Sequence, residues 1–185
     1  GPAILPAPVI KQAAEAVKDF NGMGLSILEI SHRSPEFVAV MDEAEQLVKD
    51  LLKLSDDFEV LFLTGGASSQ FFMTVMNLLD HDAKACYVDT GTWSTKAIKE
   101  AKQLANIDVI ASSKESNFNF IPKDYTVPSD ATYLHFTSNN TIFGTEYHWW
   151  PDTQVPFVCD MSSDIFSRPI DVKKYSLIYA GAQKN

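Results

Sequence analysis

The chain has 185 residues, enough for one domain with a substantial core. Hydrophobic residues make up 45% of it and charged residues 21%, which excludes a disordered or collagen-like chain. The formal net charge of −9 argues against a general nucleic-acid binder, which needs a basic face, but allows an anionic substrate held by a few local cations.

The cysteines and the apolar runs indicate a cytoplasmic protein. Cys86 and Cys159 are far apart in apolar runs, so we expect small core residues rather than a disulfide scaffold or a zinc ribbon. No run approaches the roughly 18 apolar residues of a membrane span. The first residues lack the basic and apolar regions of a signal peptide. The chain stops at Asn185 without a closing element, which suggests a fragment.

The sequence of the first third of the chain predicts an extended arm and two helices. Residues 1–8 carry three prolines and predict the arm. The apolar spacing indicates a helix over 9–20, and a strand or loop follows through 25–30. Ser34-Pro35-Glu36 begins a long amphipathic helix that reaches residue 52. Serine suits the N-cap, proline the first helical position and glutamate the positive helix end.

The rest of the chain alternates strands with helices. The continuous apolar run Val60-Leu61-Phe62-Leu63 indicates a strand buried on both faces. The other expected elements are helices over 68–79 and 94–104, strands over 85–88, 107–111, 133–136, 157–159 and 177–179, and a loop over 112–130. This alternation predicts an α/β fold with a mostly parallel, doubly wound sheet flanked by helices.

Five polar clusters follow predicted strands. Ligands of parallel sheets bind beyond the carboxyl ends of the strands, so these clusters should converge on one edge. They are Gly65-Gly66-Ala67-Ser68, Thr90-Gly91-Thr92-Trp93, Thr137-Ser138-Asn139-Asn140-Thr141, Asp160 and Gly181-Ala182-Gln183-Lys184.

Taken singly, these residues allow plain as well as functional interpretations. The glycines and hydroxyls of 65–69 form either an ordinary strand–helix turn or a cup of N–H groups for a phosphate, although the Walker pattern is absent. Lys184 is either a solvated loop lysine or a desolvated Schiff-base lysine. Asp160 is either a turn residue or an acid that keeps a cofactor nitrogen protonated. Trp93 alone indicates a core aromatic.

Together, the ordered motifs resemble those of the phosphoserine aminotransferase family, class V aminotransferases that use pyridoxal 5′-phosphate and share the fold of aspartate aminotransferase. The motifs, all quoted from this chain, are Gly1-Pro2-Ala3-Ile4-Leu5-Pro6, Ile30-Ser31-His32-Arg33-Ser34, Gly65-Gly66-Ala67-Ser68-Ser69-Gln70-Phe71, Thr90-Gly91-Thr92-Trp93-Ser94, Asn140-Thr141-Ile142-Phe143-Gly144-Thr145, Ser167-Arg168-Pro169-Ile170-Asp171 and Tyr179-Ala180-Gly181-Ala182-Gln183-Lys184-Asn185.

The resemblance runs through the whole chain and implies its domain organisation. It implies an arm over 1–8 and, over 9–185, an incomplete large domain of the fold type I of pyridoxal-phosphate enzymes, with a mostly parallel mixed sheet flanked by helices. That domain ends just after the Schiff-base lysine. Family members are about twice as long, so the small C-terminal domain is expected to be missing.

The resemblance also implies the residues that hold pyridoxal phosphate. These are Lys184, which forms the Schiff base, Asp160, which faces the pyridine nitrogen, Trp93, which stacks on the ring, Thr141, which contacts the ring hydroxyl, and Ala67, Ser68 and Gln183, which hold the cofactor phosphate.

Two further residues and the reaction are implied in the same way. His32 and Arg33 resemble the pair that meets the substrate phosphate from the partner subunit of a homodimer. The implied reaction is reversible amino-group transfer between O-phospho-L-serine and 2-oxoglutarate, in serine and in some organisms pyridoxal phosphate biosynthesis. No metal, nucleic acid or membrane partner is expected, and the 185-residue chain by itself is expected to be inactive.

Three other functions fit the sequence less well. Another fold type I aminotransferase, such as a small-amino-acid:glyoxylate aminotransferase, has less need of His32 and Arg33. A non-catalytic binding module has no need of Asp160, Trp93 and Lys184. A nucleotide-binding Rossmann domain would show G-x-G-x-x-G after its first buried strand, which is absent.

The remaining conspicuous residues are interpreted as structural. They are Lys96, Lys99 and Lys102 as a solvated helix face, His81, His135 and His148 as core or surface histidines, Trp149 and Trp150 as packing residues, and Arg168-Pro169 as a turn.

Overall fold

The computed structural model describes residues 3–183 and divides the chain into two compact units, Gly1–Phe62 and Leu63–Asn185. The expected division into an arm over 1–8 and a large domain over 9–185 stays a prediction. Each unit is described by itself.

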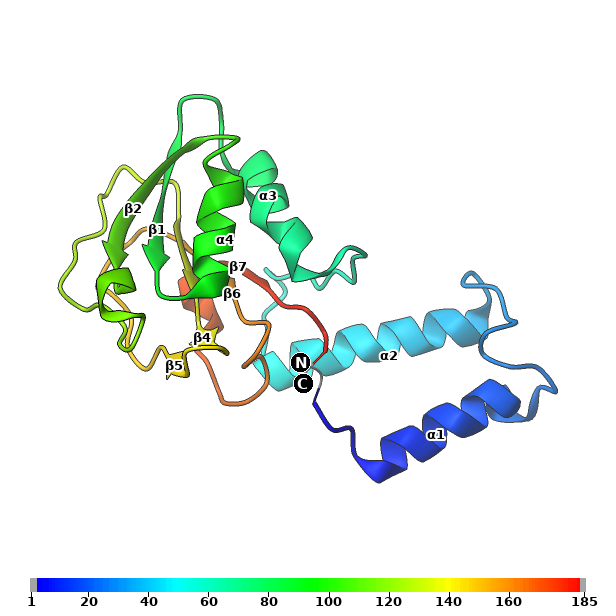
Figure 1. Ribbon diagram of the computed structural model, residues 1–185. Coiled ribbons are helices and arrows are strands. Elements are labelled where there is room, and N and C mark those ends of the chain that lie inside the picture. The colour runs from blue at the N-terminus through cyan, green and yellow to red at the C-terminus, as the bar shows by residue number, and fades with distance from the viewer. Residues whose placement is uncertain (1–2, 184–185) are drawn as a thin grey trace. The chain divides into compact units, whose positions relative to one another are not determined.

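The first unit contains two amphipathic helices, α1 (Ala7–Lys18) and α2 (Pro35–Leu52), with a short 3₁₀ helix over Phe20–Gly22 between them (Figure 1). Helix α2 begins as predicted, because the Ser34 hydroxyl accepts a hydrogen bond from the N–H of Phe37 at 3.4 Å. Residues 25–30 form turns rather than a strand.

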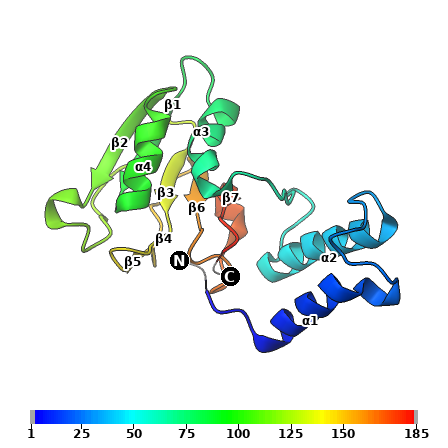
Figure 2. The same cartoon turned by 45° about the vertical axis from the view of Figure 1, so that its right-hand side comes forward.

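The second unit is built on a five-stranded sheet with all neighbours parallel, in the order β2-β1-β3-β6-β7 (Figure 2). The strands are β1 (Lys84–Asp89), β2 (Asn106–Ser112), β3 (Leu134–Thr137), β6 (Phe157–Asp160) and β7 (Tyr175–Tyr179). All five predicted strands from residue 85 onward are therefore confirmed, within one or two residues at each end.

One face of this sheet is covered by helices α3 (Gly66–Leu78) and α4 (Thr92–Ala101), which lie side by side in Figures 1 and 2. Phe71 and Val75 of α3 and Ala97 of α4 are buried in the cluster that joins the helices to the strands. The predicted helices over 68–79 and 94–104 are thus confirmed, although both begin about two residues earlier.

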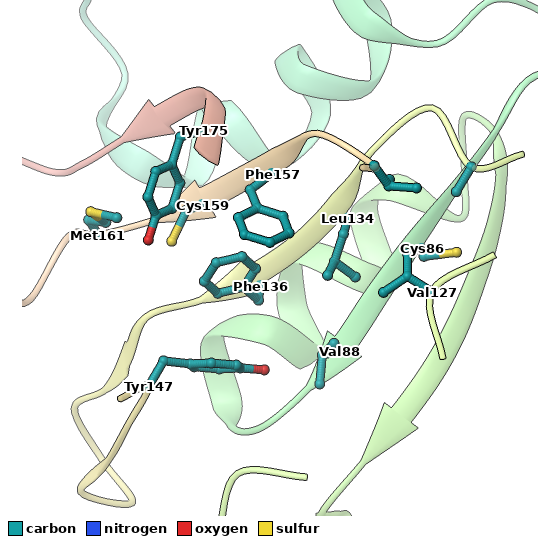
Figure 3. Close-up of a cluster of buried hydrophobic side chains, with 12 residues drawn as sticks. Cys86, Val88, Val127, Leu134, Phe136, Tyr147, Phe157, Cys159, Met161 and Tyr175 are labelled. Atoms are coloured by element: carbon teal, nitrogen blue, oxygen red, sulfur yellow. The ribbon is translucent and has the colours of Figure 1, made fainter. Parts of the chain in front are cut away.

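Connecting segments cover the opposite face. Figure 3 shows Leu134 and Phe136 of β3 with Phe157 and Cys159 of β6 in one apolar cluster. Val127 and other residues from the connections complete this cluster. Cys86 and Cys159 are both fully buried and free, so the prediction of small core cysteines is confirmed.

The predicted buried strand over 60–63 is wrong. These residues have no regular structure, and Leu61, Phe62 and Leu63 are 73%, 53% and 59% exposed. A strand needs a neighbour to pair its backbone groups, and none pairs with this run among residues 3–183. An apolar run shows only that its side chains favour burial. It does not show whether a partner strand is present.

A short antiparallel hairpin was missed. Strands β4 (Asn139–Asn140) and β5 (Thr145–Glu146) pair Asn139 with Glu146 and Asn140 with Thr145. Two residues are too few to show an alternating pattern, so the sequence indicated only a polar cluster here.

A buried histidine lies between tyrosines on the helix-covered face of the sheet. His135 of β3 stacks on Tyr87 with ring centroids 4.4 Å apart, and its Nε2 lies 2.8 Å from the hydroxyl of Tyr179. Complete burial lowers the pKa of His135 from 6.5 to about 3, because the charged ring would lose its hydration. His135 is therefore a neutral core residue.

This burial predicts a loss of stability in acid. Between about pH 6.5 and pH 3 the unfolded chain binds a proton at His135 that the folded chain does not, so the free energy of unfolding falls as the pH falls. In urea titrations of the whole protein, wild type should lose about 2 kcal/mol more than His135→Gln between pH 7 and pH 5. Equal losses in the two proteins would contradict this assignment.

Candidate active site

The polar clusters meet at the carboxyl ends of the parallel strands. The register pairs Thr137 of β3 with Asp160 of β6, and Asp160 with Tyr179 of β7, so these three strands end in one row. Strand β1, on the other side of β3, ends at Asp89. The expected convergence on one edge of the sheet therefore holds for the clusters that follow β1, β3, β6 and β7.

Asp160 is a buried acid at the centre of this edge, with 4% of its surface exposed. One oxygen, Oδ1, accepts hydrogen bonds from the N–H of Ser162 at 2.9 Å and from its hydroxyl at 2.6 Å. Acidic residues are rarely this buried without such partners. The carboxylate is thus held in one orientation by the turn that follows its strand.

The start of α3 lies beside the loop that follows β7. Gly65 and Gly66 have φ of 105° and 67°, a backbone conformation that favours glycine, and they aim the chain into α3. A Cβ placed on Gly181 would lie 3.7 Å from the Cβ of Ala67 and 3.8 Å from both the backbone N of Ala67 and the Nε2 of Gln183. The first-turn N–H groups of a helix and an amide side chain are thereby brought together.

This arrangement suits an anion. The first N–H groups of a helix have no acceptor within the helix, and the helix dipole favours negative charge there. Ala67 and Ser68 stand in that first turn. The structure therefore brings Ala67 and Gln183, two of the predicted phosphate-binding residues, to one place, while their roles stay predictions.

Asp89 organises the start of α4, which carries Trp93. Its Oδ1 accepts hydrogen bonds from the hydroxyls of Ser94 at 3.0 Å and Thr95 at 2.7 Å. The Ser94 hydroxyl in turn accepts from the N–H of Gly91 at 2.9 Å. Trp93 itself is half-buried: it packs against the buried cluster of α3, α4 and the strands, and the Nζ of Lys96 lies 4.6 Å from the centroid of its ring.

Asn140 holds the hairpin against the start of α4. It is 1% exposed, and its side-chain amide donates to the hydroxyl of Thr90 at 3.1 Å and to that of Thr145 at 3.2 Å. A Cβ on Gly91 would lie only 2.6 Å from the Oδ1 of Asn140, so glycine is needed there for close approach. Thr141, the predicted contact of the ring hydroxyl, follows Asn140 directly.

Arg168, interpreted from sequence as part of a simple turn, links the hairpin to the segment after β6. Its Nη2 donates to the carbonyl of Tyr147 at 2.7 Å and lies 3.6 Å from Asp164, and its Nε lies 3.0 Å from Glu146. The hydroxyl of Ser138 donates to Asp164 and, at 3.0 Å, to the carbonyl of Asp160. No sequence motif indicated this connection, because its members come from three separate segments.

The two predicted substrate-phosphate residues lie in the other unit. His32 and Arg33 are exposed just before the first residue of α2, with the Nε of Arg33 3.4 Å from the Nε2 of His32. Lys184, the predicted Schiff-base lysine, lies outside the described residues, which end at Gln183. Among residues 3–183, no group of three or more His, Cys, Asp or Glu side chains is placed to hold a metal ion.

The fold and these motifs define the class of the protein. All 185 residues match the family model described as aminotransferase class-V, so the chain belongs to that family. This confirms the resemblance and the predicted α/β fold. None of the helices in residues 3–183 is both long and apolar enough to cross a membrane.

The more similar relatives carry one particular name. Phosphoserine aminotransferase of Parabacteroides distasonis is 60% identical over 185 residues, which are all of this chain and 52% of that protein. A solved phosphoserine aminotransferase from Bacillus circulans subsp. alkalophilus matches with a TM-score of 0.95 at 46% identity, over all of this chain and 52% of that one.

A third relative has a named ligand. The solved phosphoserine aminotransferase of Trichomonas vaginalis, described as bound to pyridoxal phosphate, matches with a TM-score of 0.91 at 35% identity and covers 100% of this chain and 56% of that one. The chain spans about half the length of the relatives it matches.

The Arg168 network predicts a specific loss of stability. Arg168→Met would leave Asp164 buried without its cation, and we expect the free energy of unfolding of the whole protein to fall by roughly 2–4 kcal/mol. Urea titration measures this loss. Lys174→Met is the matched control, because the Nζ of this exposed lysine lies 5.9 Å from the Trp150 ring, as the Arg168 Cζ does at 5.7 Å.

The double variant separates charge from packing. Asp164→Asn added to Arg168→Met removes the unpaired charge and should restore part of the lost stability. A double variant as unstable as the sum of the two single variants would show that the ion pair is not the stabilising feature.

Proposed function

We propose that this chain is the cofactor-binding part of a phosphoserine aminotransferase that transfers the amino group of O-phospho-L-serine to 2-oxoglutarate. One observation carries the proposal. The end of β6 presents a buried acid, Asp160, and the neighbouring loop after β7 lies against the N-terminus of α3 at Ala67. The 60% identity with a protein of that name supports the same function.

The described residues fit pyridoxal phosphate as the cofactor. The site offers an acid for a ring nitrogen, N–H groups and the Gln183 amide for a phosphate, and a half-buried indole, Trp93, for the ring plane. When bound, pyridoxal phosphate supplies an electron sink for the carbanion formed at the substrate Cα. Asp160, with its negative charge, would favour the protonated form of the ring nitrogen and so strengthen that sink.

Two other residues of the chain would orient and move the proton. Trp93 would stack on the ring plane, which orients the Cα–H bond for cleavage. Lys184 would take the proton from the substrate Cα as a general base and, as a general acid, deliver it to C4′ of the cofactor. The loop 181–183, closed by a hydrogen bond from the N–H of Gln183 to the carbonyl of Gly181 at 2.8 Å, leads directly to this lysine.

His32 and Arg33 would select the phosphorylated substrate. They precede the N-terminus of α2, where free N–H groups already favour an anion. Arg33 adds a permanent positive charge with two parallel donors, and His32 adds a donor. In the family these residues come from the partner subunit, so a cytoplasmic homodimer with shared active sites belongs to the proposal.

An assay of amino-group transfer by the whole protein tests the proposal. Loaded with pyridoxal phosphate, it should transfer the amino group from O-phosphoserine to 2-oxoglutarate, and Lys184→Ala should lose nearly all turnover. Borohydride reduction followed by mass spectrometry should place the cofactor on the peptide that contains Lys184. Faster turnover of alanine with glyoxylate, or an adduct on another lysine, would overturn the proposal.

Arg33 is tested by comparing two amino donors. A charge-assisted contact is worth about 1.5–3 kcal/mol, so Arg33→Ala should lower kcat/KM for O-phosphoserine roughly 10- to 100-fold. The half-reaction with glutamate, which has no phosphate, should change less. Lys11→Ala removes an exposed cation of the same unit and should affect neither donor. If Arg33→Ala weakens both donors by the same factor, Arg33 does not recognise the phosphate.

A further inference from the structure

One hydroxyl, that of Ser162, joins the two halves of the candidate site. It donates to the Oδ1 of Asp160 at 2.6 Å and accepts from the N–H of Gly181 at 3.0 Å. The N–H of Ser162 also donates to the same Oδ1 at 2.9 Å. Ser162 therefore touches the acid of the site on one side and the loop that leads to Lys184 on the other.

The direction of these bonds follows from their chemistry. A backbone N–H can only donate and an ionised carboxylate can only accept, so the hydroxyl between them is oriented one way. In a series of linked hydrogen bonds, each bond polarises the next and strengthens it. The low dielectric constant away from bulk water adds to this effect. Ser162 is half-buried, and its two partners belong to segments about twenty positions apart.

The hydrogen bond to Gly181 lies just beyond the point where the pairing of β6 with β7 ends. The last paired residues of β6 and β7 are Asp160 and Tyr179, and the N–H of Met161 donates to the carbonyl of Tyr179 at 2.9 Å. Beyond this point the two chains separate into loops. The Ser162 hydroxyl links these loops one step farther out, at the level of the candidate site.

We propose that Ser162 is a positioning residue that holds the Asp160 carboxylate in its charged, oriented form and fixes the loop carrying Lys184 at a set distance from it. This inference rests on the proposed function and adds to it a residue that no motif singled out. Ser162 acts through Asp160 and Gly181 and contacts no reacting atom.

The titratable neighbours of Asp160 do not obscure a test by pH. Burial raises the pKa of Tyr179 on β7 and that of Cys159 on β6 well above their ordinary values. Burial lowers the pKa of His135 on β3, behind Tyr179, to about 3. Burial raises the pKa of Asp164, the next acid along the chain, but its partners are Ser138 and Arg168, which Ser162→Ala leaves in place. None of the first three groups titrates between pH 4 and pH 8.

The experiment compares variants of the whole protein loaded with pyridoxal phosphate. The rate of the half-reaction with glutamate is measured as a function of pH, because glutamate has no phosphate that titrates. The acid limb is the part of this profile in which the rate falls as the pH falls. Loss of the Ser162 donor raises the proton affinity of the Asp160 carboxylate, so in Ser162→Ala the acid limb should move up by about one pH unit. The maximal rate should fall about 10-fold, while KM and cofactor affinity change little. Ser162→Thr keeps the hydroxyl and should resemble wild type.

The matched control is the next residue. Ser163 is also half-buried, and its hydroxyl donates to the carbonyl of Asn139 at 2.9 Å. Ser163→Ala removes a comparable hydroxyl, so it should lose comparable stability but leave the acid limb in place. If Ser162→Ala does not fold, Ser162→Cys, of similar size and with a weak donor, takes its place.

A second measurement needs no cofactor. The N–H of Gly181 should exchange with solvent at least 10-fold faster in cofactor-free Ser162→Ala than in wild type or Ser163→Ala, as followed by mass spectrometry of peptides covering 180–183. An unshifted acid limb in Ser162→Ala, an equal shift in Ser163→Ala, or unchanged Gly181 exchange would overturn the inference. A wild-type protein that exchanges as expected but has no aminotransferase activity would instead overturn the proposed function.

Discussion

The parallel pairing of β6 between β3 and β7 is the constraint on which the candidate site depends. It places the ends of three strands in one row, with Asp160 between Thr137 and Tyr179. Parallel strands end at the same edge, so every connection that leaves this edge adds its first residues to a common surface. A shift of β6 by one residue would turn Asp160 to the opposite face, into the apolar cluster of Phe136 and Phe157.

Polar groups that are buried at this edge require partners, and those partners shape the loops. Asn140 joins the hairpin to the start of α4, and Arg168 joins the hairpin to the segment after β6. Ser162 joins that segment to the loop after β7. Each link satisfies a group whose burial alone would be unfavourable. The resulting network ties these loops to one another, and a site that positions reacting groups needs such support.

The prediction from sequence succeeded where one local cause decides the structure. Ser34 caps α2 as its side-chain chemistry demands, and Cys86 and Cys159 are core residues because their runs are apolar. It failed for residues 60–63, whose apolar side chains are exposed, because a strand also needs a partner strand. Arg168 lies in a bend, as its prediction as a turn residue implied, but its ion pairs were not predicted. Its partners Glu146 and Asp164 are not recognisable as partners from spacing along the chain.

The sequence by itself determined the family, the alternation of strands and helices from α3 onward, and the strands that four of the five polar clusters follow. These depend on composition, period and motif, all of which are local or are read in order along the chain. Only the tertiary structure decided that Ala67 lies beside Gly181 and Gln183, and that one serine contacts both Asp160 and Gly181. Such contacts join residues far apart in sequence. Sheet register and the need to pair buried polar groups set them, and neither is encoded in any single segment.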